Sequence, residues 1–404
     1  MKRAVLVYGL LFIFSVMLSC AKPEQEPVAE QGDGIPVDQI FEYAAGQLSK
    51  SVAQVTDAEA FPFYTDKETG LWETMDDSWW ASGFFSGCLW LMYEHTGDDI
   101  WRTHAVKWTE SLKNQTSNTS DADIGYRIVN SYGNAYRLTG DETYRDGLLE
   151  SAASLAARYS DRIGCVKAYD MDEWKYPILI DHMMNIELLF IGANSDDGGV
   201  AGWKEMAEKH AVKTMETCIR EDGSSIQVVD LDPDTGEVLG HYTLCGLDGN
   251  SAWARGQGEG IYGFAIAYRE TRNPVFLEAA MTLADYFLEN LPEDKVPYWD
   301  FKDPEIPYTI RDASAASMTA DGLLEMCALM APGAERDRYY NAAVEILESL
   351  YENYMTTGTN SYGIIDHASF QGKDIMGADT SLVFGDYNFL SALMKYQRMN
   401  RSEP

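Results

Sequence analysis

The sequence predicts an all-α protein, an (α/α)6 barrel of six helical hairpins with a small β-hairpin insertion. A helix–turn–helix motif recurs at residues 93–101, 136–144 and 268–276, where one apolar-periodic segment ends, a Gly, Asp or Asn turn follows, and another segment begins. Strand-like sequence is confined to small patches. A recurring motif of this kind is typical of stacked helical hairpins.

Apolar residues at helical spacing predict about twelve helices. In chain order they span residues 38–54, 82–95, 99–115, 125–138, 142–159, 181–192, 200–220, 253–270, 274–290, 312–331, 335–356 and 386–399. The even-numbered helices are richer in aromatic and small residues, so we expect them to form the inner ring of a closed barrel. An open solenoid is the alternative arrangement.

The β-hairpin insertion is predicted at residues 225–229 and 238–244, joined by an Asp-Pro-Asp-Thr-Gly turn. Elsewhere, the starts of the even-numbered helices should meet at one end of the barrel, because alternate helices run the same way. Polar, aromatic and acidic residues at these starts predict a pocket in that mouth. The six stretches are 79–84, 123–126, 181–185, 251–257, 311–314 and 378–381.

The N-terminal region predicts export. Residues 1–19 join a short positive start to an apolar run too short to span a membrane, as in a signal peptide. The run ends in Met-Leu-Ser-Cys, which resembles a bacterial lipoprotein cleavage box and implies lipidation of Cys20; an incidental Cys is the alternative. Residues 20–36 then form a lipid-anchored flexible tether, and residues 37–404 form the barrel domain. We expect an exported lipoprotein, periplasmic or outer-membrane associated, that touches the membrane only through its anchor.

Charge and cysteine content exclude several classes of protein. The formal net charge of −33 argues against nucleic-acid binding, because nothing supplies a basic patch for phosphates. A locally basic pocket can still accept an anion. The five cysteines after Cys20 are widely spaced and predict neither a disulfide framework nor a zinc site. We expect no metal and no cofactor, and the sequence leaves the oligomeric state open.

Two aspartates at helix starts are candidate catalytic residues. Asp123 precedes the helix at 125–138, where Asp is also a common N-cap. Asp181 lies between Ile-Leu-Ile and a Met-Met pair, and burial in such surroundings raises the pKa of a carboxyl, whereas a helix N-terminus favours the anion. If the two lie close together, repulsion keeps one of them protonated near neutral pH. Glycoside chemistry commonly needs one protonated and one ionised carboxyl.

Aromatic residues and one arginine at the same mouth are candidate sugar ligands. Trp79, Trp80, Tyr169 and Trp253 can stack on a sugar ring, with core packing as the alternative for each. Arg255 follows near a helix start, where a cation gains nothing from the helix dipole. Its guanidinium either pairs with one of the many acids of the chain or binds a carboxylate of the ligand.

At these residues the chain resembles the unsaturated glucuronyl hydrolases, glycoside hydrolase family 88. The likeness runs from about residue 79 to residue 390, and several long matches in the correct order make it specific. It is carried by WASGFFSG at 80–87, DIGY at 123–126, DHMMN at 181–185, SAWARGQ at 251–257, VPYWDF at 296–301, RDASA at 311–315 and FGDY at 384–387.

The resemblance implies a metal-free catalytic domain that acts on oligosaccharides left by polysaccharide lyases, with a 4,5-unsaturated uronic acid at the non-reducing end. In such enzymes a carboxylic acid protonates C4, water adds at C5, and the hemiketal collapses to release the sugar. Asp181 matches the general acid/base of the family and Asp123 its second essential carboxylate. The matching and neighbouring positions give a predicted substrate-binding set of Trp80, Tyr169, Gln227, His241, Thr243, Cys245, Trp253, Arg255 and Glu259.

The chain departs from the family pattern at several positions near this predicted pocket. They are Ala122 for His, Tyr169 for Trp, Gln227 for His, Leu244-Cys245 for His-Gln, Glu259 for Trp and Asn388 for Tyr. Because both aspartates are kept, we hypothesise that hydration persists in surroundings rebuilt for another linkage or sulfation pattern. Glu259 is alternatively expected to share the acid/base work. The competing functions are an unsaturated rhamnogalacturonyl hydrolase-like enzyme and a non-catalytic carbohydrate-binding lipoprotein.

Overall fold

Every second helix of the protein is buried on nearly all sides. In the computed structural model, which describes residues 34–195, 200–373 and 375–401, α2 is buried without a break from Ser82 to Met92. Helices α9 and α11 are enclosed in the same way. These inner helices are α2 (Ser82–Thr96), α4 (Ile124–Ile128) continued by η2 (Val129–Gly133) and α5 (Asn134–Thr139), α7 (Glu187–Ala193), α9 (Ala254–Thr271), α11 (Ala313–Leu329) and α13 (Val383–Arg401).

The intervening helices are amphipathic and bury one face only. In α1, for example, Ile40, Phe41, Ala44 and Leu48 face the core at helical spacing. These outer helices are α1 (Val37–Gln54), α3 (Asp99–Ser111) followed by η1 (Lys113–Gln115), α6 (Glu142–Ala156), α8 (Ala201–Cys218), α10 (Pro274–Glu289), and α12 (Ala334–Ser349) followed by η4 (Leu350–Tyr354).

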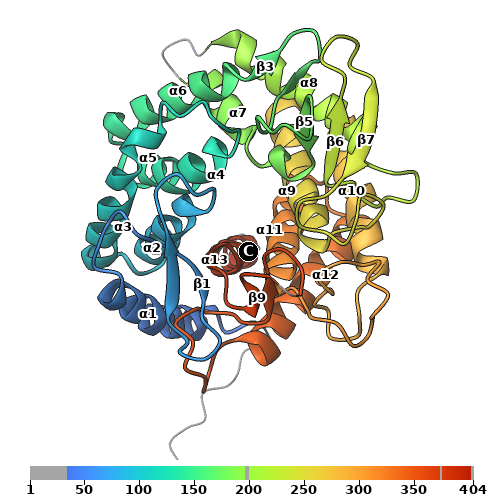
Figure 1. Ribbon diagram of the computed structural model, residues 1–404. Coiled ribbons are helices and arrows are strands. Elements are labelled where there is room, and N and C mark those ends of the chain that lie inside the picture. The colour runs from blue at the N-terminus through green and yellow to red at the C-terminus, as the bar shows by residue number, and fades with distance from the viewer. Residues whose placement is uncertain (1–33, 196–199, 374, 402–404) are drawn as a thin grey trace, which may run out of the picture. The chain divides into compact units, whose positions relative to one another are not determined.

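The inner helices pack against one another in chain order, and α13 packs against α2. The last inner helix therefore returns to the first, and Figure 1 looks into the resulting ring of helices. This contact decides against an open solenoid. The predicted (α/α)6 barrel, with its division into inner and outer helices, is confirmed in the described part of the chain.

The recurring turn motif ends three inner helices in the same way. Gly97, Gly140 and Arg272 adopt left-handed backbone conformations, with φ of 70°, 65° and 59°, and each donates its N–H to a Tyr carbonyl four residues earlier. Glycine accepts this conformation freely, whereas an L-residue such as Arg272 pays about 1 kcal/mol. Asn273 then caps α10 through Val275 N.

Two predicted inner helices are not continuous, which corrects their sequence-based bounds. The segment predicted as one helix over 181–192 begins with the 3-10 turn η3 (Asp181–Met183), and α7 starts only at Glu187. The segment over 125–138 contains the π-helical turn η2. A close contact lies beside the first break: a Cβ on Gly125 would lie 2.4 Å from the Cα of Asn185, so α4 fits directly against the link between η3 and α7.

The predicted β-hairpin is present and has a third strand. Strands β5 (Pro177–Leu179), β6 (Val228–Leu231) and β7 (Val238–Tyr242) form an antiparallel sheet in that order. The sequence did not predict β5, which places the Asp181 segment next to the hairpin. The remaining strands pair in short ladders: β1 (Phe61–Thr65) with β2 (Trp72–Met75), β3 (Tyr159–Ser160) with β4 (Cys165–Val166), and β8 (Ala368–Ser369) with β9 (Ala378–Thr380).

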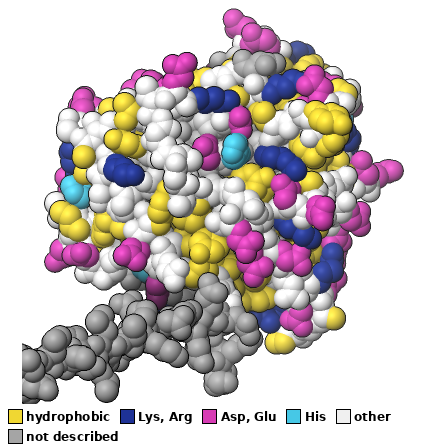
Figure 2. Space-filling view, turned by 90° about the horizontal axis from the view of Figure 1, so that it is seen from below, with side chains coloured by type: hydrophobic (Ala, Val, Ile, Leu, Met, Phe, Trp, Pro, Cys, Tyr) yellow, Lys and Arg dark blue, Asp and Glu magenta, His cyan; other side chains and the backbone are white. Residues whose placement is uncertain are grey.

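The surface charge, the helices, the N-terminal segment and the cysteines each bear on the predicted class of protein. On the face drawn in Figure 2, acidic and basic side chains are interspersed rather than separated by sign. None of the described helices is long and apolar enough to cross a bilayer. The predicted signal peptide 1–19, Cys20 and the tether up to residue 33 lie outside the described residues. Five described cysteines are buried free thiols: Cys88, Cys165, Cys218, Cys245 and Cys327.

Candidate active site

A cavity of about 310 Å³ lies at the end of the barrel where the inner helices start. Four of the six stretches predicted for this mouth line it, those before α2 and at the starts of α4, η3 and α9. The stretches at 311–314 and 378–381 do not, and the loop between β8 and β9 takes their place. The lining residues are Ser78, Trp79, Trp80, Asp121, Asp123, Tyr126, Arg127, Tyr169, Asp181, Gln227, Leu244, Cys245, Trp253, Arg255, Phe370 and Gln371.

Asp123 stands at the N-cap position of α4, but its carboxylate does not cap the helix. It instead accepts hydrogen bonds from the Tyr169 hydroxyl, at 2.7 Å, and from the Asn185 amide, at 3.3 Å. Nε2 of His182 lies 3.2 Å from its Oδ1. Burial raises the pKa of Asp123, but the hydrogen bond and charge of His182, with the charge of Arg127, hold that pKa below its ordinary value. Asp123 is therefore an anion.

Asp181 begins η3 and is 9% exposed. Its backbone carbonyl accepts a hydrogen bond from the Tyr126 hydroxyl at 2.9 Å, whereas its side-chain Oδ1 has no partner among the described residues. Burial raises the pKa of Asp181 to about 6; the negative charge of Asp123 adds to this shift, and the positive charge of His182 opposes it. Below about pH 6 the cavity therefore holds a neutral acid beside an anion, as predicted for one member of the pair.

Arg255 does pair with an acid, which was one of its two predicted roles. It is 3% exposed, and its Nη1 donates to Oε1 of Glu259 at 3.2 Å. Nη2 donates to the Phe370 carbonyl at 3.1 Å, and the guanidinium carbon lies 4.3 Å from the Trp253 ring centroid. Nε has no partner within the described part of the chain. The guanidinium thus lines the cavity in a fixed orientation.

The hairpin contributes through Gln227 and the residues just after β7. Oε1 of Gln227 accepts hydrogen bonds from the Thr243 hydroxyl at 2.5 Å and from the N–H groups of Leu244 and Cys245, both at 2.8 Å. His241 and Thr243, which belong to the predicted substrate-binding set, do not line the cavity. His241 is exposed on the edge strand β7, and Thr243 turns its hydroxyl to Gln227 instead.

The predicted departures from the family pattern divide into two groups. Four of them line the cavity: Tyr169, Gln227, Leu244 and Cys245. Three do not line it and are buried in the surrounding core: Ala122, Glu259 and Asn388. The rebuilt positions are therefore not confined to the cavity wall.

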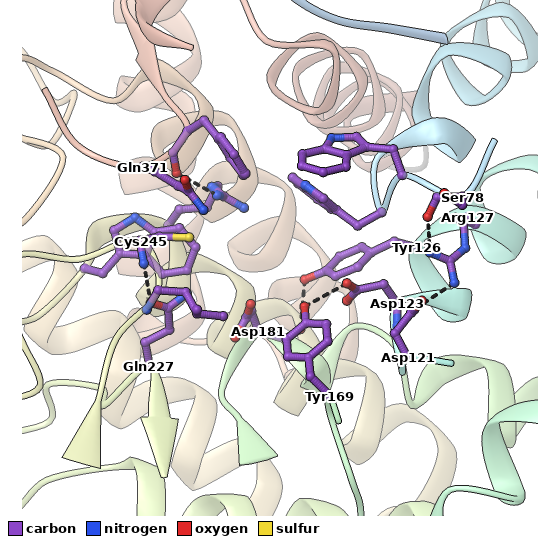
Figure 3. Close-up of a pocket in the computed structure, with 16 residues that line it drawn as sticks. Ser78, Asp121, Asp123, Tyr126, Arg127, Tyr169, Asp181, Gln227, Cys245 and Gln371 are labelled. Atoms are coloured by element: carbon purple, nitrogen blue, oxygen red, sulfur yellow. Dashed lines mark hydrogen bonds and ion pairs between the residues drawn. The ribbon is translucent and has the colours of Figure 1, made fainter. Parts of the chain in front are cut away.

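Aromatic rings form the wall opposite the hairpin. Trp79 and Trp80 both line the cavity, and the Trp80 ring lies parallel to that of Phe370 with centroids 6.0 Å apart. Figure 3 shows Asp123 and Tyr169 on one side of the cavity, Gln227, Cys245 and Gln371 on the other, and Asp181 between them. Within the described residues, no group of three or more His, Cys, Asp and Glu side chains is placed to hold a metal ion.

Sequence reasoning missed several residues of the site. His182 could have been predicted, because it directly follows Asp181 and lies in the same turn. Arg127, whose Nη2 lies 2.7 Å from Oδ1 of Asp121, had no comparable signal. Phe370 and Gln371 had none either, since the loop between β8 and β9 brings them from far along the chain.

An (α/α)6 barrel whose mouth joins a neutral and an ionised carboxyl, aromatic rings and a guanidinium defines a glycoside-cleaving enzyme. The sequence is 34% identical over 403 residues to the unsaturated glucuronyl hydrolase of Formosa agariphila, with 98% of each chain covered. The chain belongs to the unsaturated glucuronyl hydrolase family.

Further similarities agree with this membership. The unsaturated glucuronyl hydrolase of Bacillus sp. (strain GL1) is 34% identical over 331 residues, which are 80% of this chain and 87% of that protein. The crystal structure of an unsaturated glucuronyl hydrolase specific for heparin superposes with a TM-score of 0.85 at 32% identity, covering 90% of this chain and 98% of the other. No protein-family model matches the sequence.

Proposed function

We propose that the protein removes a 4,5-unsaturated uronic acid from the non-reducing end of lyase-generated oligosaccharides by hydrating the ring double bond. The observation that carries this proposal is the unequal pair of carboxyls. Asp181 has its pKa raised to about 6 and an oxygen without a partner among the described residues, and Asp123 is held as an anion by His182 and Tyr169.

The two carboxyls suit different parts of this reaction. Asp181 donates its proton to C4 of the vinyl ether, and the ring oxygen shares the positive charge that develops at C5. Asp123 stabilises that charge as a neighbouring anion. Water then adds at C5 and gives a proton to the Asp181 carboxylate, which restores the acid. The resulting hemiketal opens and collapses, and the remaining sugar leaves with its own hydroxyl group.

Arg255 suits the uronate carboxylate. Its guanidinium lines the cavity close to the Trp253 ring and keeps Nε without a partner among the described residues. A planar guanidinium matches a carboxylate in geometry and charge. The strongly acidic chain therefore still offers a local cationic group to an anionic sugar.

We further propose glycosaminoglycan fragments as the substrate class. One similar enzyme, that of Streptococcus agalactiae, is an unsaturated chondroitin disaccharide hydrolase, 31% identical over 336 residues. A mutant of an enzyme from that organism has been solved with dGlcA-GalNAc6S bound, at a TM-score of 0.77 and 28% identity. The different side chains at Tyr169, Gln227 and Cys245 support an altered preference for linkage or sulfation.

A panel of lyase-generated disaccharides tests both proposals. Hydration destroys the conjugated chromophore, so turnover appears as loss of ultraviolet absorbance, whereas binding alone leaves the absorbance unchanged. We expect loss with one or more glycosaminoglycan disaccharides. Loss only with unsaturated rhamnogalacturonan products identifies the rhamnogalacturonyl alternative. Binding without any loss identifies a carbohydrate-binding lipoprotein and contradicts the proposed reaction.

We also propose that the enzyme is exported and held by a lipid at Cys20. The apolar run within residues 1–19 and the Met-Leu-Ser-Cys sequence at its end support this proposal. Replacing Cys20 by Ser tests it, with cell fractionation and detergent partitioning as the measurements. The wild-type chain should partition with membranes and the variant should not, while both retain hydrolase activity. Equal partitioning of the two contradicts the anchor.

A further inference from the structure

Glu259 lies behind the cavity wall rather than in it. It stands one helical turn after Arg255 on α9, the helix that starts at the mouth. Only 1% of it is exposed, and it is absent from the cavity lining. Oε1 accepts from Arg255, and Oε2 has no hydrogen-bond partner among the described residues. A substrate in the cavity therefore meets Arg255 and not Glu259.

The guanidinium of Arg255 is held by two hydrogen bonds and by aromatic rings, which include Phe384 with its centroid 4.6 Å and Trp80 with its centroid 5.3 Å from the guanidinium carbon. Nη1 is bound to Glu259, Nη2 to the Phe370 carbonyl, and the ring of Trp253 covers one face at 4.3 Å. The Phe370 carbonyl belongs to a loop and carries no formal charge. Glu259 is thus the sole carboxylate among the described residues that forms an ion pair with Arg255.

We propose that Glu259 is a positioning residue that holds Arg255 against the cavity wall and sets, by its own charge, how strongly the cavity binds the substrate carboxylate. The inference rests on the proposed function, because the unsaturated uronic acid supplies that carboxylate. When Glu259 is neutral, Arg255 presents a full positive charge to the substrate. When Glu259 is ionised, the buried pair is neutral and attracts an anion less strongly.

The charged groups around Arg255 and Glu259 set the pH at which Glu259 ionises, and that pH is accessible to experiment. Burial raises the pKa of Glu259 to about 8; Arg255 opposes the shift, and the charge of Asp181 from η3 adds to it. Tyr126 of α4 also faces Glu259, and its hydroxyl lowers that pKa. The charge of Asp312, which lies just before α11, raises the pKa of Arg255. Glu259 is therefore neutral below about pH 8 and ionised above it.

The test is the pH dependence of KM in the wild type and in Glu259→Gln. Gln keeps the acceptor for Arg255 but stays neutral at every pH. Wild-type KM for an unsaturated disaccharide should rise about five- to tenfold between pH 7 and pH 9, whereas KM of the variant should stay flat. Near pH 6, where Glu259 is already neutral, kcat of the variant should stay within about threefold of wild type. Turnover by the wild type tests the proposed function separately.

A matched control is Glu205→Gln, which removes the carboxylate of another i,i+4 pair, with Lys209 at 2.7 Å on the exposed face of α8. It should leave both kinetic constants unchanged. A parallel rise of KM in Glu259→Gln overturns the proposal. A fall of kcat by two orders of magnitude or more at all pH values also overturns it, because Glu259 would then share the acid/base work.

A measurement on the wild type alone keeps the proposal testable if the variant does not fold. The methyl ester of the unsaturated uronic acid has no carboxylate to respond to the charge of Arg255. Wild-type KM for the ester should stay flat from pH 7 to pH 9 while KM for the free acid rises. Equal changes for ester and acid overturn the proposal.

Discussion

Nε2 of His182 lies 3.2 Å from Oδ1 of Asp123, and the two residues are only 1% and 6% exposed. In this buried setting the imidazolium and the carboxylate favour each other's charged forms. Burial lowers the pKa of His182, but the hydrogen bond and charge of Asp123 outweigh burial and raise it. The same contact lowers the pKa of Asp123 while that of Asp181 is raised. His182 therefore helps to separate the two aspartates into an anion and an acid.

Replacing His182 by Gln should raise the pKa of Asp123, because Gln can donate a hydrogen bond but carries no charge. We expect the acidic limb of kcat/KM to move up by about one pH unit, with about a tenfold loss of kcat at the optimum. Initial rates from pH 3.5 to pH 8 measure both. His210→Gln is the control, since His210 is buried and its pKa is lowered to about 3, so it is already neutral. An unmoved acidic limb in His182→Gln contradicts this role.

The state of Asp181 should set the alkaline limit of turnover. This carboxyl is neutral below its pKa of about 6 and ionised above it, and only the neutral form can protonate C4. We therefore expect kcat to fall about tenfold per pH unit above pH 6 to 7. Rates at saturating substrate across this range check the expectation. Constant kcat up to pH 8 would exclude Asp181 as the proton donor.

Replacing Asp181 by Asn should greatly reduce turnover and stabilise the fold at neutral pH. We expect kcat to fall by about three orders of magnitude. Because the folded pKa is raised above its ordinary value of 3.8, ionised Asp181 costs stability above pH 6, by about 2 to 3 kcal/mol. The variant should gain that stability at pH 7 but not at pH 4. Urea unfolding at both pH values measures the gain, and equal effects at the two pH values would contradict it.

The matched control for that stability change is Asp303→Asn. Burial raises the pKa of Asp303, but hydrogen bonds outweigh burial and lower it; the Trp299 ring N–H donates to its carboxylate at 2.6 Å. Ionised Asp303 is therefore favoured by folding. Its replacement should destabilise the protein at pH 7, the opposite sign to Asp181→Asn.

The barrel could be predicted from sequence because its information is local. The turns at Gly97 and Gly140 mark helix ends by composition alone, and the buried and one-sided helices differ in their apolar patterns. The 3-10 turn at Asp181 has no such local cause. Just after this turn, Asn185 packs directly against Gly125, a residue far away in the chain, and no periodic pattern predicts that contact.

The residues of the site likewise divide into those that local sequence predicts and those that depend on tertiary contacts. Asp123, Asp181 and Arg255 could be predicted because Asp123 and Arg255 lie at the starts of inner helices and Asp181 begins the turn that leads into α7, and the barrel gathers these segments. The absence of His241 from the cavity wall could not be predicted, since it depends on which face of an edge strand meets the cavity. Gln371 could not be predicted either, because it reaches the cavity wall through a loop whose position is set by tertiary contacts.

Asp312 should stabilise the loop between β8 and β9. Its Oδ1 accepts hydrogen bonds from the N–H groups of Ser314, at 3.0 Å, and Ala315, at 3.1 Å, which caps α11. The same oxygen accepts from Ser369 N at 3.2 Å, next to the Phe370 carbonyl that holds Arg255. We expect Asp312→Ala to lower the free energy of unfolding by about 2 to 4 kcal/mol and to raise KM, because the loop loses its tie.

Urea unfolding and steady-state kinetics check these effects, with Asp141→Ala as the matched control. Asp141 also caps a helix, α6, but it is exposed and makes a single capping bond, to Thr143 N at 2.9 Å. Its loss should cost only about 1 kcal/mol and leave KM unchanged. Equal losses in the two variants would show that Asp312 acts as an ordinary cap. An unchanged KM in Asp312→Ala would show that the loop keeps its position without the tie to Ser369.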